Sequence, residues 1–310
     1  MATRRNPLAQ RLVYVAARGF LGLMGALPLP AARAITIGIC RVALALVPRL
    51  HRVGLDNIDQ AYGDALTPAE KRALLRGAMD NMARVGAEFA HLQHASQANF
   101  EGYVRVEGIE RFDPSGALLV SGHIGNWEWC AGALAAHGAH MCLVVRPLDF
   151  PPMNTFVERM RTVPGVDMIE KNDAAQGILK HIAGGGVAGL MIDQSPRENG
   201  IPATFFGRDC WATVAPGIIA RKAGCNVHFL EMVRQPAGDY VITVSPPLDL
   251  QDTGDRLGDL QANVQCTQDT LEAFVRQHPD HWLWFHRRWK DRPKLREEWN
   301  ARQEAAGRGE

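Results

Sequence analysis

The stretch from Ala117 to Gly138 reads ALLVSGHIGNWEWCAGALAAHG and changes character twice along its length. Its first residues, Ala117 to Val120, form a short apolar run that suits a strand buried on both faces, and Gly122 allows a sharp turn. Asn126 is a good N-cap for the alanine-rich residues that follow. The stretch therefore predicts a strand, a turn and a helix in immediate succession.

His123 and Glu128 lie at this corner, five positions apart. Five residues at about 100° each would leave roughly 140° between them on one regular helix. They can meet only if His123 lies in the turn and Glu128 in the first helical turn, where the helix dipole also favours a carboxylate. We expect Glu128 to accept a hydrogen bond from one imidazole nitrogen and to leave the other free as a base. The alternative is a buried histidine bonded to a backbone carbonyl, beside a glutamate that serves only the dipole.

Apolar runs alternate with helix-like stretches along the rest of the chain. The runs that suit strands are Met141 to Val145, Val187 to Ile192, Val227 to Met232 and Tyr240 to Val244. Helical patterns occupy Met153 to Arg161, Ala174 to Ala183, Pro216 to Ala223 and Val264 to Gln277, and an earlier one begins at the Thr67 cap and Pro68 and runs to about Leu92. This alternation predicts an α/β fold with a mostly parallel central sheet covered by helices.

The amino-terminal segment from Leu12 to Val47 is almost wholly apolar, yet arginines interrupt it and Pro28 and Pro30 divide it. Neither half gives the roughly 18 to 20 uncharged residues of a clear membrane span. The arginines recur at helical spacings that place them on shared faces, at Arg11, Arg18, Arg33 and Arg41. This pattern predicts two amphipathic helices on an anionic membrane surface, with the arginines among phosphates. A helical hairpin packed on the protein's own core is the alternative.

Length and charge limit the remaining possibilities. The 310 residues carry 34 basic and 33 acidic side chains, so the protein has no global attraction to nucleic acid. Six cysteines are scattered without C-x-x-C spacing and suit small core residues in a reducing compartment. We expect a membrane-associating region at 1–50, a catalytic domain at 51–295, and a charged tail at 296–310 that frays.

Further polar residues follow the predicted strands. Arg146 lies at the end of one strand, Arg161 lies one helix later, and Asp193 lies at another strand end. Ligands of parallel sheets bind outside the carboxyl ends of the strands, so His123, Arg146 and Asp193 should converge. Each could instead serve a surface ion pair or a loop cap.

The segment Trp282 to Lys290 interleaves tryptophan and phenylalanine with Arg287 and Arg288. We expect this basic aromatic strip to lie beside the mouth of the site, where its cations would hold acceptor phosphates or an acidic carrier protein. A solvated basic face, or a strip for nucleic acid, is the alternative.

Taken together, these motifs resemble a known family. GHIGNWE, RPLDFP, DQSP, TFFG with ATVAPGIIARKAG, and WLWFHRRWKDRP occur in this order up to about Pro293. They are similar to the bacterial lipid A secondary acyltransferases, the lauroyl and myristoyl transferase group of the lysophospholipid acyltransferase superfamily. The resemblance implies a glycerolipid-acyltransferase-like fold, a catalytic dyad of His123 and Glu128, a functional arginine at Arg161, and a place on the cytoplasmic face of a bacterial inner membrane.

The activity that follows is transfer of a fatty acyl chain to a hydroxyl of a lipid A precursor or related glycolipid. The donor would be a phosphopantetheine thioester of acyl carrier protein or CoA, with no metal and no other cofactor. His123 would take the hydroxyl proton, and backbone N–H groups at Gly125 and Asn126, or else Arg161, would stabilise the oxyanion. No G-x-S-x-G elbow is present, so direct attack by the acceptor is favoured over a covalent acyl-enzyme. The alternatives are another lipid acceptor, a thioester hydrolase with the same dyad, or a non-catalytic membrane-binding protein.

Overall fold

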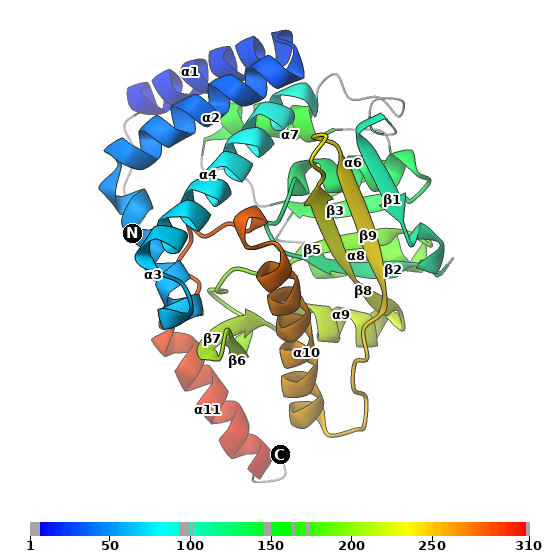
Figure 1. Ribbon diagram of the computed structural model, residues 1–310. Coiled ribbons are helices and arrows are strands. Elements are labelled where there is room, and N and C mark those ends of the chain that lie inside the picture. The colour runs from blue at the N-terminus through cyan, green and yellow to red at the C-terminus, as the bar shows by residue number, and fades with distance from the viewer. Residues whose placement is uncertain are drawn as a thin grey trace.

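A computed structural model describes residues 7–92, 100, 102–113, 115–145, 150–162, 165–170 and 174–307. Its centre is a seven-stranded sheet in the order β1-β9-β8-β2-β5-β3-β4 (Figure 1). The five strands from β8 to β4 run parallel, and β9 and β1 run in the opposite direction at one edge. The predicted mostly parallel sheet is therefore confirmed.

The strand bounds follow the predicted apolar runs. The strands of the sheet are β1 (Val104–Glu107), β2 (Ala117–Ser121), β3 (Met141–Val145), β4 (Val166–Glu170), β5 (Val187–Met191), β8 (Asn226–Arg234) and β9 (Tyr240–Pro247). The sequence analysis did not anticipate β1, β4 or the separate antiparallel hairpin of β6 (Gly200–Phe205) and β7 (Arg208–Thr213). These segments are short or mixed in polarity, so periodicity did not distinguish them from loops.

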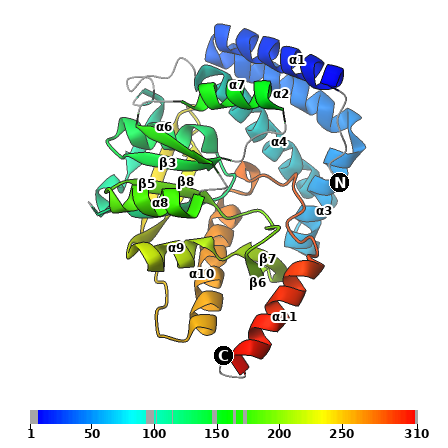
Figure 2. The same cartoon turned by 180° about the vertical axis from the view of Figure 1, so that it is seen from behind.

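Helices cover both faces of the sheet, as Figures 1 and 2 show. On one face lies α6 (Trp127–Ala136), with α4 (Pro68–His91) packed against it. The other face is covered by α8 (Ala174–Ala183), α9 (Ala215–Ala223) and α10 (Arg256–Gln277). Alternate residues of β2 enter the two cores, Leu118 on the side of α8 to α10 and Leu119 on the side of α6. This two-sided burial explains why β2 is apolar at every position up to Val120.

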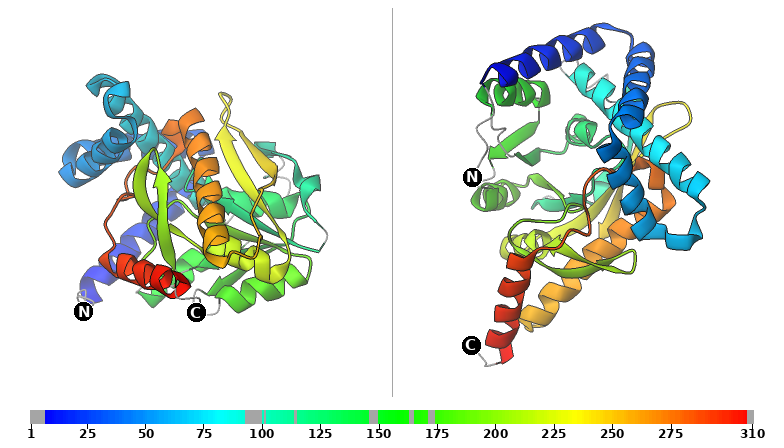
Figure 3. Two further views of the ribbon diagram at one scale, coloured as in Figure 1. Left: turned by 90° about the horizontal axis from the view of Figure 1, so that it is seen from below. Right: turned by 90° about the vertical axis from the view of Figure 1, so that its left-hand side faces the viewer.

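The amino-terminal segment forms three helices, α1 (Pro7–Ala26), α2 (Leu29–Leu46) and α3 (Pro48–Tyr62). Helix α2 lies along α4, and α1 passes over α7 (Pro151–Arg161), as the right-hand view of Figure 3 shows. Within the described residues, α2 is the one helix that is long and apolar enough to cross a membrane by length and composition. The predicted helices are confirmed, but Arg33 and Arg41 do not face outward together. Arg33 bonds the buried Glu88 of α4, so the expectation that Arg33 lies among phosphates is wrong. Arg41 bonds Asp80 of α4 but its side chain is 58% exposed, and its place among phosphates stays a prediction.

The carboxyl-terminal segment differs from the expected frayed tail. Residues Pro293–Gly307 form α11, which packs against β6. Leu295 and Trp299, one helical turn apart, are 1% and 5% exposed. These two apolar side chains pack an otherwise charged helix against the protein. Two apolar residues among many charged ones are too weak a pattern to predict this packing from the sequence.

Candidate active site

The turn after β2 presents His123 at the carboxyl end of the central strand. The backbone N–H of Gly125 donates to His281 O, and Leu283 N–H donates to His123 O, so the turn is held by the segment that follows α10. Gly125 has a φ of 59°, and a Cβ there would lie 2.0 Å from Met232 O. Glycine is therefore required for the close approach of this turn to β8.

Asp193 holds the His123 ring. It follows β5 directly, beside the end of β2, and its side chain is fully buried. Oδ1 of Asp193 lies 2.8 Å from Nδ1 of His123, and Oδ2 accepts from His123 N at 3.0 Å and from Trp282 Nε1 at 3.0 Å. With the proton on Nδ1, the lone pair of Nε2 is left for a substrate.

Glu128 has a different partner from the one predicted. It lies in the first turn of α6, and its carboxylate receives two hydrogen bonds from Arg161, at 2.9 Å from Nε and 2.7 Å from Nη2. The predicted hydrogen bond between Glu128 and His123 is not present between these two described side chains. The guanidinium of Arg161 binds the Glu128 carboxylate in a bidentate manner. Asp193, which lies seventy residues after His123 in the sequence, bonds the imidazole instead.

The charges around His123 act against each other. Burial lowers the pKa of His123, but the carboxylate of Asp193, with a smaller contribution from Glu128, raises it above its ordinary value in the balance. Burial alone would raise the pKa of Asp193, yet the imidazole and its hydrogen bonds hold that pKa well below its usual range. The pair therefore favours an ionised acid beside a histidine that readily accepts a proton.

A cavity of 420 Å³ opens at His123. His123, Glu128 and Arg161 lie on its wall, and the ring of Trp127 meets the imidazole edge-on at 5.2 Å. The rest of the cavity lies between α6 and the sheet and is mainly apolar, lined among others by Leu119, Leu134, Met141, Leu143 and Leu230. A titratable cluster thus stands next to a space that suits a hydrocarbon chain.

Comparison with known proteins identifies the family of the chain. The family model described as bacterial lipid A biosynthesis acyltransferase matches residues 3–291. The chain belongs to this acyltransferase family. It is 22% identical over 287 residues to the lipid A biosynthesis lauroyltransferase of Escherichia coli (strain K12), covering 89% of this chain and 90% of that one. It is 23% identical over 247 residues to the lipid A biosynthesis acyltransferase of Haemophilus influenzae, covering 76% of each chain. The protein is therefore an acyltransferase of lipid A biosynthesis.

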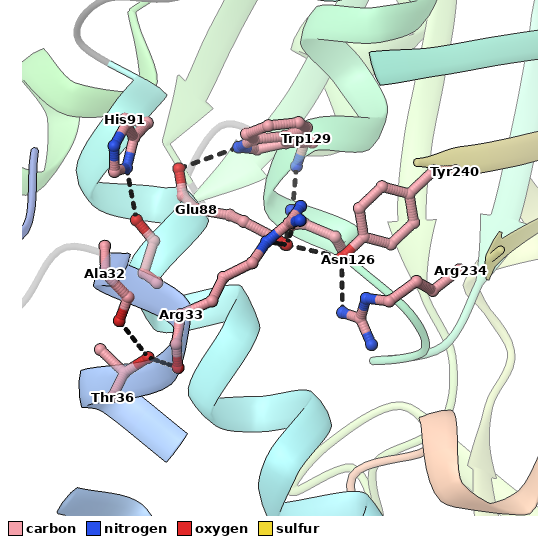
Figure 4. Close-up of polar contacts among 10 residues, drawn as sticks. Ala32, Arg33, Thr36, Glu88, His91, Asn126, Trp129, Arg234 and Tyr240 are labelled. Carbon is pink, nitrogen blue, oxygen red and sulfur yellow. Dashed lines mark hydrogen bonds and ion pairs between the residues drawn. The ribbon is translucent and has the colours of Figure 1, made fainter. Parts of the chain in front are cut away.

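The helix that carries Glu128 in this acyltransferase is fixed by a buried polar cluster, shown in Figure 4. Glu88 of α4 is 0% exposed, and its carboxylate accepts from Arg33 at 2.7 Å, from Asn126 Nδ2 at 2.6 Å and from Tyr240 OH at 2.6 Å. Asn126 in turn caps α6 by accepting from Trp129 N. Sequence reasoning missed Glu88, because a lone acid on a helix carries no signal until its burial is known.

The same contacts change the roles expected of Gly125 and Asn126. The N–H of Gly125 already donates to His281 O, so it is not free for an oxyanion. The Asn126 side chain bonds Glu88 and caps α6, and the role expected of the Asn126 backbone N–H stays a prediction. Arg161 is the predicted oxyanion donor that lines the cavity. Arg146 lies outside the described residues.

Much of the basic aromatic strip, residues 282–290, is buried inside the protein. Trp282 and Trp284 are 1% and 0% exposed. Arg288 is fully buried, donates to Trp211 O and Gln268 Oε1, and lies over the ring of Phe205. The expectation that Arg288 binds acceptor phosphates is therefore wrong, because its charge is used to join the β6–β7 hairpin to α10.

Arg287 is exposed but lies away from the catalytic cavity. It lines a separate hollow of 210 Å³ against α3, together with Lys290. The structure thus brings together His123, Glu128, Arg161 and Asp193 and leaves Arg287 and Arg288 apart.

Proposed function

We propose that this acyltransferase moves a fatty acyl chain from a thioester of acyl carrier protein or CoA to a hydroxyl of a lipid A precursor, with His123 as the general base. The observation that carries the proposal is the His123–Asp193 pair, whose Nε2 side opens on the 420 Å³ apolar cavity. The cavity would hold the acyl chain with its thioester carbonyl beside His123.

In the proposed reaction, Nε2 of His123 takes the acceptor hydroxyl proton as the oxygen attacks the thioester carbonyl. Asp193 keeps the ring in the correct tautomer and stabilises the imidazolium. Collapse of the tetrahedral intermediate breaks the carbon–sulfur bond, and the imidazolium returns the proton to the departing thiolate. The products are an ester and a free thiol, so no covalent acyl-enzyme is needed.

Glu128 and Arg161 would act as a unit in this reaction. The two hydrogen bonds from Arg161 hold its guanidinium on the cavity wall, where its positive charge can stabilise the oxyanion. The negative charge of Glu128 also stabilises the protonated form of His123, since it contributes to the raised pKa of that histidine. The family dyad of His123 and Glu128 is therefore retained in the proposal, with Asp193 as the direct partner of the ring.

Membrane association at the cytoplasmic face of the inner membrane is part of the proposal. The exposed large apolar side chains are concentrated on α1 and α2, among them Leu8, Leu12, Val13, Phe20, Ile39 and Val42. Exposed apolar area of this kind on amphipathic helices favours insertion at a lipid interface.

The proposal is tested with purified full-length protein, acyl carrier protein and CoA thioesters, and a lipid A precursor in mixed micelles. We expect an acylated lipid and stoichiometric free thiol, both lost in His123→Ala. Thiol release that is independent of acceptor would instead indicate a thioester hydrolase. Transfer to a lysophospholipid or an aminolipid, and not to the lipid A precursor, would overturn the acceptor assignment.

A further inference from the structure

A groove of 520 Å³ lies between α1 and α7. Each helix contributes one face to it, α1 through Tyr14, Arg18, Leu21 and Gly22, and α7 through Pro152, Thr155, Phe156, Arg159 and Met160. Tyr14 packs edge-on against Phe156, with ring centroids 6.2 Å apart, which joins the two helices at the groove. The groove therefore combines two arginines with an aromatic and apolar wall.

The two arginines of the groove have no acidic partner among the described residues. Arg18 donates to Tyr14 OH at 3.2 Å, and no ion pair between described residues involves Arg18 or Arg159. By contrast, Arg33 and Arg41 on the neighbouring helix are both paired with carboxylates. Two unpaired guanidinium groups on facing helices suit a phosphate, which accepts forked hydrogen bonds.

The groove shares α7 with the catalytic cavity. Arg159 and Arg161 are two residues apart, so they point about 200° apart around the helix. Arg161 reaches Glu128 in the cavity, and Arg159 reaches the groove under α1. A lipid held by its phosphate in the groove would thus lie across α7 from the catalytic cavity, next to the apolar surface of α1.

We propose that Arg18 and Arg159 bind a phosphate monoester of the lipid acceptor. The inference rests on the proposed function for its acceptor, and it assigns to Arg18 and Arg159 the phosphate contact that was expected of Arg287 and Arg288. Phosphate groups of bulk anionic phospholipid share the same chemistry, so the experiment must separate the two sources.

The test compares Arg18→Gln, Arg159→Gln and the double variant with Arg11→Gln, a control on an exposed position of the same helix. We expect the double variant to raise KM for the phosphorylated acceptor at least tenfold, with kcat little changed, because a ground-state contact is removed. KM for a dephosphorylated acceptor should not change, and neither should that of Arg11→Gln.

An equal effect on both acceptors, or none, would overturn the proposal. An effect that follows the phosphatidylglycerol content of the micelles, and not the acceptor phosphate, would assign the groove to bulk lipid and also overturn it. Flotation with neutral vesicles, with and without the phosphorylated acceptor, gives a readout that needs no turnover. Loss of acceptor-dependent flotation in the double variant would support the groove even if acyl transfer itself were not observed.

A second, independent cluster lies at the amino ends of β3 and β4, whereas His123 lies at the carboxyl end of β2. His140 immediately precedes β3, Asp167 lies in β4, and His181 lies in the last turn of α8. One ligand atom from each lies within 4.8 Å of the others. Oδ2 of Asp167 is 3.1 Å from Nε2 of His140 and 3.6 Å from Nδ1 of His181.

The tautomer of His181 gives this cluster its chemistry. Its Nε2 lies 3.0 Å from His140 O, a carbonyl that can only accept, so Nε2 must carry the proton. In the neutral ring, Nδ1 then directs a lone pair at the carboxylate of Asp167. Two electron-rich atoms face each other, and either a second proton or a metal ion must lie between them.

We propose that His140, Asp167 and His181 bind a divalent transition-metal ion, with Zn²⁺ as the best match. Imidazole and carboxylate ligands at about 2.0 to 2.2 Å from a tetrahedral zinc lie roughly 3.3 Å from one another, close to the two separations above. The bond from His181 to a backbone carbonyl orients that ligand, as is usual around zinc. The ion would join β3 and the edge strand β4 to α8 and brace Met141, a residue of the cavity wall.

Metal-free, full-length protein titrated calorimetrically with Zn²⁺ tests this site. We expect binding of one ion and a rise in Tm of roughly 4 °C at a hundredfold excess over Kd. His140→Gln and Asp167→Asn should weaken binding at least tenfold. His137→Gln is the matched control, because His137 bonds a carbonyl of its own helix.

The absorption spectrum of the Co²⁺-substituted protein distinguishes this site from metal binding by the six free cysteines, because thiolate ligands would give a charge-transfer band. Absence of one-to-one binding, or equal affinity in the His140 and Asp167 variants, would overturn the proposal. A doubly protonated His181 ring in nitrogen NMR that Zn²⁺ does not displace would show that a proton fills the cluster instead.

Discussion

Replacing Asp193 by asparagine should disable the base while leaving the fold in place. The carboxylate accepts three hydrogen bonds, two from His123 and one from Trp282. An amide has a single oxygen, so its NH₂ must face at least one of these donors. If it faces Nδ1, the ring proton moves to Nε2, and the nitrogen that opens on the cavity can no longer accept one.

The expected loss follows from this change of tautomer. Replacing the orienting aspartate of a catalytic histidine by asparagine costs about 10⁴ in kcat in the serine hydrolases. We expect a loss of about 10³ to 10⁴ here, which corresponds to about 4 to 5 kcal/mol of transition-state stabilisation. The acidic limb of the pH profile should also move. Because Asp193 raises the pKa of His123 above its ordinary value, the base form in the wild type accumulates only at higher pH. Without the charge, burial dominates and any residual activity should set in at lower pH.

The assay is kcat/KM for acyl transfer between pH 5 and 9, measured beside a melting curve for each variant. Asp259→Asn is a matched control, because Asp259 is also a buried acid but bonds Thr253 and Gly254 away from the site. Retention of more than a tenth of the wild-type rate by a folded Asp193→Asn protein, or an acidic limb that does not move, would refute the role assigned to Asp193.

Three further changes test other parts of the site. Glu128→Gln should lower kcat by about 10² or more, because Arg161 loses its ionic partner on the cavity wall; a change confined to KM would contradict this role. Gly189→Val should shift the preferred acyl donor to shorter chains, because Gly189 lines the cavity and a Cβ there would lie 3.1 Å from Leu143. The expected loss in binding free energy is about 0.8 kcal/mol per excluded methylene. Competition between thioesters of different chain length measures this shift, and an unchanged preference would show that the acyl chain binds elsewhere. Glu88→Ala should destabilise the fold by about 3 to 5 kcal/mol, because Arg33 loses its ionic partner and the truncated side chain leaves a buried space. Denaturant unfolding measures this change, and a loss below 1 kcal/mol would show that the charge of Glu88 does not stabilise the cluster.

The sheet could be predicted in outline because its central strands are buried on both faces and therefore read as unbroken apolar runs. The corner at His123 could be placed because an apolar strand, a glycine turn and an N-cap follow one another there. The prediction that Glu128 is the carboxylate that meets the imidazole was wrong. Glu128 is near His123 along the chain and Asp193 is near it in the sheet, and only the pairing of β2 with β5 puts Asp193 within hydrogen-bond distance.

The basic aromatic strip shows the opposite difficulty. Arginine beside tryptophan is equally typical of a wet interface and of a buried cation packed on rings, and local sequence does not distinguish the two. Arg288 takes the second form because Gln268 and the Trp211 carbonyl, both far away along the chain, supply its acceptors.

The Glu88 cluster has a mechanical consequence for the proposed action at a lipid surface. A single carboxylate is bonded at once to α2, to the cap of α6 and to β9. Any tilt or change of depth of the amino-terminal helices must therefore be felt at the helix that carries Glu128. The amino-terminal helices and the catalytic domain are therefore coupled, so exchanging or shortening these helices should misalign the catalytic residues even in a protein that still binds lipid.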